Sequence, residues 1–256
     1  MDWMEKAMLT ALLVAGVLFA GRLFGRKTAG LLAGLPTVTG PALVWIELDF
    51  GPAHAIEAAT GAVAACALCA LFALVYERAS RRVNALAALL AASAAGAAAT
   101  LPLQWLRGEL LVAWGVASAA AWAAYRAIPE RAPNAQCAVR VRGEIWLTAA
   151  VSAGVSAAVG LCAPHAGAYW AGMLASPPLL AAVVAMHHQL FLGPRAVGEF
   201  MRGYAAGLFG RAVFGVAFAL LVATAGLTAA ALAGTLICCG CTAAALRLAS
   251  PRTQPA

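Results

Sequence analysis

Charged side chains are scarce in this chain of 256 residues: Asp, Glu, Lys and Arg together make up 11% of it, whereas 64% of it is apolar. A soluble domain carries about 25% charged and about 45–50% apolar residues. A chain with so few polar groups cannot cover a globule in water, so its solvent is largely lipid. The composition therefore excludes a soluble domain and predicts an all-α, polytopic integral membrane protein.

Sequence motifs of catalysis are also missing. The chain has no nucleophile elbow, phosphate-binding loop, HExxH or paired acidic metal motif, so we expect no enzyme, no cofactor and no bound metal. The net charge of +7 does not indicate a nucleic-acid partner, because the basic residues lie in short gaps between apolar runs rather than in one cluster. The seven cysteines lie mostly inside apolar runs, where we interpret them as small packing residues.

Apolar runs of about 20 residues, the length that crosses a bilayer as a helix, predict nine transmembrane spans. They lie at 7–24, 29–48, 53–76, 84–103, 109–126, 145–163, 168–190, 197–224 and 226–246. The first run resembles a signal peptide, but Asp2 and Glu5 precede it and a second apolar run follows, so we interpret it as a span. In the eighth span, the spacing Gly203-x-x-x-Gly207 predicts close contact with another helix.

The basic residues divide unequally between the two sides that nine spans define. Thirteen of them fall on one side, and only Lys6 and Arg107 fall on the other. Cytoplasmic loops of membrane proteins carry an excess of Lys and Arg. This asymmetry therefore predicts a multi-pass protein of the inner (plasma) membrane, with the N-terminus outside and the C-terminus in the cytoplasm.

An internal repeat emerges when the chain is aligned with itself so that Ala29 falls on Ala171. Ten of the 33 positions from 29 to 61 are then identical, among them Gly51-Pro52, which matches Gly193-Pro194. Spans one to four pair with spans six to nine, and span five lies between them, so the second copy enters the membrane from the opposite side. We expect inverted repeats at 1–103 and 145–256, joined by a central span and cytoplasmic linker at 104–144.

The second span of each copy contains a cluster that interrupts a helix. The clusters hold Pro36, Thr37, Thr39 and Pro41 in the first copy and Ser176, Pro177 and Pro178 in the second. Proline removes a backbone donor, and breaks at matching positions of two inverted repeats indicate a binding site at the bilayer midplane. The alternative is a pair of simple kinks relieved by threonine hydroxyls and neighbouring helices.

Two glutamates also occupy matching positions. Glu57 and Glu199 each follow the glycine of a Gly-Pro turn by six residues, which places each about 9 Å into a helix, from opposite sides of the membrane. Carboxylates at that depth are costly unless paired, protonated or hydrated, so we expect them to take protons. The alternative is a carboxylate that favours the positive N-terminal dipole of its helix. Arg202 is spaced to pair with Glu199.

Arg211 is the basic residue that topology does not explain, because it lies about 13.5 Å deeper in its span than Arg202. It has two expected roles, and both belong to a buried guanidinium. In one it neutralises Glu47, Asp49 or Glu57 from the other repeat. In the other it binds an anionic substrate.

His187 and His188 lie at the end of the seventh span. Adjacent residues on a helix point about 100° apart, so both rings reach one metal ion only with help from another element. We expect a solvated interfacial pair or, as the alternative, a group that gates proton movement near neutral pH.

Together these features predict a secondary transporter with alternating access and proton coupling, whose site lies at spans two and seven. Its solute is small, and anionic if Arg211 binds it. A passive channel or facilitator and a non-transporting scaffold or assembly protein are the alternatives. The expected partners are membrane lipid and the small-molecule or ion substrate, and the sequence is compatible with a homo-oligomer.

Overall fold

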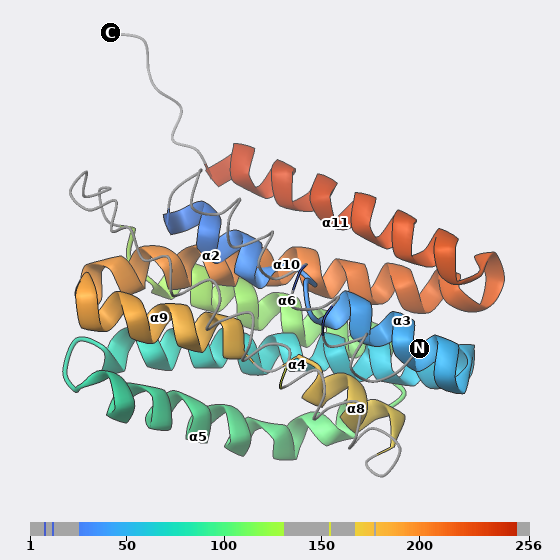
Figure 1. Ribbon diagram of the computed structural model, residues 1–256, viewed down its shortest axis with the longest axis horizontal. Coiled ribbons are helices and arrows are strands. Elements are labelled where there is room, and N and C mark those ends of the chain that lie inside the picture. The colour runs from blue at the N-terminus through green and yellow to red at the C-terminus, as the bar shows by residue number, and fades with distance from the viewer. Residues whose placement is uncertain are drawn as a thin grey trace, which may run out of the picture.

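The structure, a computed structural model, describes residues 8, 12, 26–130, 154, 167–176 and 178–249. All regular structure in this part of the chain is helical, and it contains no strand, which confirms the all-α class for these residues (Figure 1). The helices are α2 (Arg26–Gly34), α3 (Thr39–Phe50), α4 (Pro52–Ala79), α5 (Ala85–Leu103), α6 (Leu110–Ala127), α8 (Ala168–Leu174), α9 (Leu179–Phe191), α10 (Pro194–Ala225) and α11 (Leu227–Ala249), with a 3-10 turn at Gln104–Leu106.

Five helical stretches are long and apolar enough to cross a bilayer. They are Lys27–Phe50, Pro52–Ala79, Ala85–Leu106, Leu110–Ala127 and Pro194–Ala225. These stretches identify a membrane-embedded helical protein. Apart from residues 8, 12 and 154, two of the predicted spans, 7–24 and 145–163, lie outside the described residues.

Two of the predicted spans are each divided into two helices. The span expected at 29–48 consists of α2 and α3, and we call residues 35–38 between them the first break. The span expected at 168–190 consists of α8 and α9, and residues 175–178 between them are the second break. Pro36 and Pro178 stand in these breaks, where each removes a donor that a continuing helix would need. The predicted interruptions are therefore present.

The long helices α4 and α10 form the centre of the molecule and pack against each other. In Figure 1 they lie between α5 on one side and α11 on the other. Burial agrees with this arrangement. In the most apolar 18-residue stretch of each helix, 78% of α4 and 61% of α10 are buried, against 17% of the stretch that contains α5. α6 packs against both central helices, whereas α2 packs on α10 and α8 packs on α4.

Glycine lets the half-helices α2 and α8 approach the central helices closely. A Cβ atom on Gly30 of α2 would collide with a carbonyl oxygen of α10, and one on Gly172 of α8 would collide with a carbonyl oxygen of α4. The predicted contact of Gly203 and Gly207 is confirmed, since both face the backbone of α2. These backbone contacts hold the start of each broken span against the core.

The two ends of the helical bundle differ in charge. The end at the left of Figure 1 holds the C-termini of α4 and α6 and the N-termini of α2 and α10, and we call it the basic end. Its described Lys and Arg residues include Lys27, Arg78, Arg81, Arg82, Arg126 and Arg195. The opposite, acidic end holds Arg107 among Glu47, Asp49, Glu57 and Glu109. This partition follows the one in the sequence, and the side of the membrane that each end faces stays a prediction.

Candidate functional site

The first break leaves backbone carbonyls without helical partners. The last four carbonyls of a helix lack intrahelical donors, and Pro36 supplies no N–H. The N–H of Leu35 turns back to the carbonyl of Leu32 at 3.2 Å, and that of Thr37 donates to the carbonyl of Leu35 at 2.8 Å. The carbonyls at the very end of α2 therefore need donors from another element.

Arg211 of α10 supplies those donors. Its Nε donates to the carbonyl of Gly34 at 3.1 Å, and its Nη2 donates to those of Ala33 and Leu35 at 3.2 and 3.3 Å. The Arg211 side chain is buried, with 7% of the residue exposed. The guanidinium thus replaces the missing helical N–H groups at the first break.

The same guanidinium reaches the second break. Nη1 of Arg211 lies 3.5 Å from the carbonyl oxygen of Ser176, which follows α8, and 3.8 Å from the sulfur of Cys69 in α4. A guanidinium has five N–H donors, and these five contacts match that number. The C-terminal ends of α2 and α8 carry partial negative charge, so they stabilise a cation buried between them.

The carboxylates that were expected to neutralise Arg211 lie elsewhere. Glu57, near the start of α4, forms an ion pair with Arg107 at 2.6 Å and is 32% exposed. Glu47 stands eight residues beyond the start of α3, about 12 Å from the first break, and Asp49 follows it on the same helix. Within the described residues, Arg211 is instead held by carbonyls and a thiol, because two freed helix ends surround its guanidinium.

Cys69 gives the second break a donor at the position that corresponds to Arg211. The repeat alignment places Cys69 on Arg211, and the thiol of Cys69 donates to the carbonyl of Ser176 at 3.1 Å. The same alignment places Ser176 on Gly34, whose carbonyl accepts from Arg211. The packing role expected for Cys69 is therefore incomplete. Its alignment with Arg211 is the sequence signal that would have identified it.

Hydroxyl groups join the two breaks. Thr39 Oγ1 and Ser176 Oγ lie 3.2 Å apart, and Ser176 Oγ also donates to the carbonyl of Gly172 at 3.1 Å. Thr39 is 2% exposed and Ser176 1% exposed. The hydroxyl of Thr37 is buried and has no hydrogen-bond partner in the described part of the chain. Pro177 lies outside the described residues.

A cavity lies beside each break. The smaller cavity, of about 400 Å³, lies between α3 and α11 and is lined by Pro36, Thr37 and Pro41 of the broken span. The larger cavity, of about 530 Å³, lies between α9 and α5 and is lined by Ser176 and Pro178 of the other broken span. No Asp, Glu, Lys or Arg is among the described residues that line them.

Most of the lining of the smaller cavity corresponds through the repeat to part of the lining of the larger one. Nine of the twelve residues that line the smaller cavity are aligned by the repeat with a residue that lines the larger one. The pairs are Pro36 and Pro178, Gly40 and Ala182, Pro41 and Val183, Val44 and Met186, Phe214 and Phe72, Ala231 and Leu89, Thr235 and Ser93, Cys238 and Gly96, and Cys239 and Ala97. The repeat in the sequence thus relates two hollows of the structure.

Glu57 and Glu199 lie at opposite ends of the bundle, away from the breaks. Glu57 lines a third cavity of about 300 Å³ at the acidic end, together with Arg107 and His54. Glu199 is half-buried, five residues into α10 at the basic end. Neither glutamate lines a cavity beside a break. The structure therefore does not bring the two predicted proton sites together with Arg211.

His187 and His188 lie near the end of α9, also away from the breaks. Their ring centroids are 6.2 Å apart with a 63° angle between the planes. His187 packs on Phe191 at 4.5 Å, whereas His188 meets Phe200 edge-on at 5.3 Å. The two rings face different neighbours, as the helical spacing predicted.

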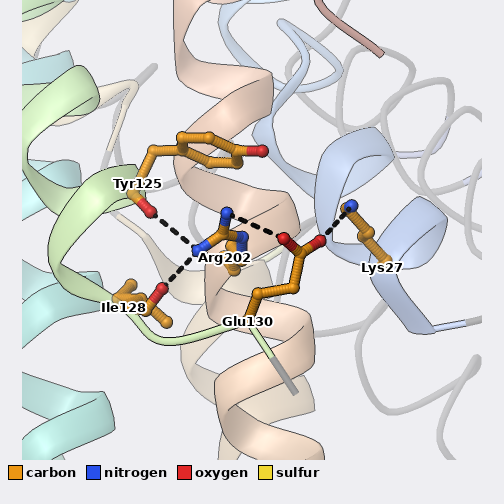
Figure 2. Close-up of polar contacts among 5 residues, drawn as sticks. All are labelled: Lys27, Tyr125, Ile128, Glu130 and Arg202. Carbon is orange, nitrogen blue, oxygen red and sulfur yellow. Dashed lines mark hydrogen bonds and ion pairs between the residues drawn. The ribbon is translucent and has the colours of Figure 1, made fainter. Parts of the chain in front are cut away.

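Arg202 is the centre of a polar cluster at the basic end (Figure 2). Its Nη1 donates to two carbonyls at the end of α6, at 3.2 and 2.6 Å, and its guanidinium lies 4.2 Å from the centre of the Tyr125 ring. Its Nη2 lies 3.4 Å from the carboxylate of Glu130, which Lys27 binds at 3.2 Å. These contacts replace the expected pairing with Glu199, because the end of α6 presents carbonyls without helical donors.

A buried carboxylate that no motif singled out lies at the same end. Glu77 of α4 is 1% exposed, and its carboxylate forms an ion pair with Arg81 one turn later. Gln189 of α9 donates to the nearby carbonyl of Ser80 at 3.2 Å. The spacing of four residues between Glu77 and Arg81 is the sequence signal for this pair.

Comparisons with models of known protein families, with curated proteins and with solved structures find no match for this chain. The class of protein is therefore defined by its own fold and site. It is a membrane-embedded protein, all-helical over the described residues, in which two broken helices meet at a buried arginine, with an apolar cavity beside each break.

Proposed function

We propose that this protein is a secondary membrane transporter of two inverted repeats, and that the paired cavities beside the breaks form its substrate site. The observation that carries the proposal is the match of nine lining residues between the two cavities. Many transporters bind substrate near the bilayer midplane, where discontinuous helices of inverted repeats meet. A scaffold protein has no need of two matched hollows beside two broken helices.

Several features support inverted repeats. The repeat alignment matches the starts of α2, α4 and α5, at positions 26, 52 and 85, with those of α8, α10 and α11, at positions 168, 194 and 227. Gly51, before α4, has φ 84° and ψ 173°, and Gly193, before α10, has φ 83° and ψ 173°. The half-helix of each proposed repeat packs on the long helix of the other, α2 on α10 and α8 on α4. With spans at 7–24 and 145–163, each repeat has four spans and the chain has nine.

The breaks are the hinges of the proposed mechanism. A helix changes direction most easily where its hydrogen-bond ladder is already interrupted. Arg211 and Cys69 keep the freed carbonyls bonded while α3 moves relative to α11 and α9 moves relative to α5. Because the repeats are inverted, the two cavities open toward opposite sides of the membrane, which is alternating access.

Protons are the proposed coupling ions. Glu57 and Glu199 occupy matching positions near the N-termini of α4 and α10, which lie at opposite ends of the bundle. Arg107 lies between α5 and α6, and its ion pair with Glu57 attaches this segment to α4. Protonation of Glu57 removes the negative charge of the pair and thereby weakens that attachment.

Access to the cavities tests the transporter without knowledge of its substrate. Cys239 lines the smaller cavity, and Ala97→Cys places a thiol at the matching position of the larger one. Each thiol is retained alone, with Cys69→Ser in the background to keep a hydrogen-bond donor. The protein is reconstituted into oriented vesicles, and a membrane-impermeant methanethiosulfonate is added to one side at a time. Gly115→Cys, on the exposed face of α6, is the control.

A transporter with inverted repeats predicts labelling of the two cavity thiols from opposite sides, and no labelling at position 115. A passive channel predicts that both thiols are labelled from both sides. A scaffold predicts that neither cavity thiol reacts with the water-soluble reagent. Either of the last two results rejects alternating access.

Proton coupling is tested with the same thiols. The ratio of the two labelling rates should change with pH, because protonation of the glutamates shifts the balance between the two states. Glu57→Gln with Glu199→Gln should remove that change, whereas Glu109→Gln, at the acidic end, should not. A pH dependence that persists in the double variant removes the coupling role of both glutamates.

A further inference from the structure

We infer that the paired cavities bind an uncharged, mostly apolar solute. This inference rests on the proposed function and names the substrate class of that same site. It takes the place of the anionic solute that Arg211 alone would suggest, and three observations carry it: the chemistry of the walls, the contacts of Arg211 and the size of the cavities.

The walls of both cavities lack charge. Neither cavity is lined by an Asp, Glu, Lys or Arg residue in the described part of the chain. The hydroxyl of Thr235 in the smaller cavity already donates to the carbonyl of Ala231 at 2.7 Å, and that of Thr100 in the larger donates to the carbonyl of Ala97 at 2.6 Å. An ion that entered either cavity would leave its hydration water without gaining a partner of opposite charge.

The nearest cation is not available to a ligand. Arg211 lies between the two breaks, but its five contacts to carbonyls and to Cys69 use as many donors as a guanidinium has. A carboxylate or phosphate that bound Arg211 would have to displace the carbonyls that end α2 and α8. Arg211 therefore holds the breaks together, and charge complementarity at the cavities favours a neutral molecule.

The volumes of the two cavities limit the size of the ligand. A dry cavity of about 150 Å³ binds benzene, so cavities of about 400 and 530 Å³ accommodate molecules of about 15 to 20 non-hydrogen atoms. Free hydrogen-bonding capacity is small. The exposed hydroxyl of Ser93 is available in the larger cavity, and the buried, unpartnered hydroxyl of Thr37 lies at the wall of the smaller one.

A pair of aromatic probes of nearly equal size tests the charge preference. 4-Bromobenzyl alcohol is uncharged and 4-bromobenzoate is anionic, and the bromine of each quenches tryptophan fluorescence. Trp170 lines the larger cavity. In lipid nanodiscs we expect saturable quenching by the alcohol and at least tenfold weaker binding of the benzoate. In a Trp45→Phe background, which removes the tryptophan of the smaller cavity, the saturable part should disappear in Trp170→Phe and remain in Trp122→Phe, since Trp122 lies exposed on α6.

Gly96 allows the larger cavity to be filled without a clash. It lines that cavity on α5, and a Cβ atom there would meet nothing within 4 Å. In the same Trp45→Phe background, Gly96→Leu should therefore reduce saturable quenching of Trp170 by the alcohol at least tenfold while leaving thermal unfolding unchanged. Gly115→Leu, at an equally open glycine on α6, is the matched control and should bind as the unmodified protein does.

A lipid acyl chain is the competing occupant, and nanodiscs of brominated phospholipid identify it. If acyl bromine quenches Trp170 and the alcohol does not compete, the cavity belongs to lipid and the inference fails. The inference also fails if the benzoate binds as well as the alcohol, or if Gly96→Leu leaves the binding intact. These outcomes leave the opposite-side labelling of the two cavity thiols untouched, so failure of the substrate class is distinguishable from failure of the transporter.

Discussion

The two breaks lie at overlapping positions of the repeat alignment but are closed by different chemistry. At the first break the charged guanidinium of Arg211 donates to the carbonyl of Gly34, whereas at the second the neutral thiol of Cys69 donates to the carbonyl of Ser176. The difference teaches that a freed helix end in a membrane needs a donor, and that either a cation or a neutral group can provide it. Because Arg211 also reaches Ser176, one side chain links both breaks, while Cys69 serves only the second.

Removing the charged donor should have the largest effect. Arg211→Met abolishes hydrogen bonds to both breaks, each worth about 1.5–3 kcal/mol to a charged group, and should lower the free energy of unfolding by at least about 3 kcal/mol. Denaturant unfolding in detergent micelles measures the loss. Arg195→Met, at an exposed arginine, should change it by less than about 0.5 kcal/mol. Equal stability of the two variants would show that Arg211 does not support the breaks.

Disturbing the backbone contacts of the two half-helices should come next. A Cβ atom on Gly30 or Gly172 meets a backbone carbonyl of a central helix, so Gly30→Ala and Gly172→Ala should each cost about 1–3 kcal/mol. The two losses should be similar if the two half-helices are equivalent. Gly115→Ala, with open space around it, should be neutral or slightly stabilising. Thermal unfolding of the three variants side by side measures this, and a tolerated alanine at only one half-helix would break the equivalence.

Removing the neutral donor should cost less than removing the cation. Cys69→Ala leaves one carbonyl of the second break with a weaker set of donors, and should lower stability by about 0.5–1.5 kcal/mol. Cys69→Ser restores a donor and should recover part of the loss, while Cys241→Ala, at an exposed cysteine, should have little effect. A loss in Cys69→Ala as large as that in Arg211→Met would mean that charge contributes nothing to closing the breaks.

An ion pair outside the breaks provides a reference energy for the buried contacts at the breaks. Glu57 and Arg107 are partly exposed at the acidic end, so their coupling energy should be only about 0.2–1 kcal/mol. A double-mutant cycle with Glu57→Gln and Arg107→Gln, followed by denaturant unfolding, measures it. A coupling energy well above this range would place the pair with the buried contacts rather than with surface ion pairs.

The sequence predicted the elements that depend on local chemistry and on the repeat. Pro36 and Pro178 interrupt their spans, and the repeat alignment matches helix starts that the structure places at positions 52 and 194. Gly203 and Gly207 were identified by spacing alone. These features could be predicted because proline, glycine and repetition act through the backbone, wherever the rest of the chain lies.

The partners of the polar side chains could not be predicted in the same way. Arg211 was recognised as too deep for topology, but its partners are carbonyls, which carry no signature in a sequence. Arg202 binds the end of α6 and Glu130, far from it in the chain, rather than Glu199 on its own helix. The partners of both arginines depend on tertiary packing, which places a helix end without hydrogen-bond donors beside each guanidinium.

The lengths of the helices have a consequence for the surrounding bilayer. α4 has 28 residues and α10 has 32, which makes them about 42 and 48 Å long, whereas α6, with 18 residues, is about 27 Å long. A hydrocarbon layer of about 30 Å matches α6 but not the two central helices, which must tilt or project from it. The mismatch between helix length and bilayer thickness therefore differs among helices that are packed together. A change in lipid chain length should change the tilt of α4 and α10 in the membrane.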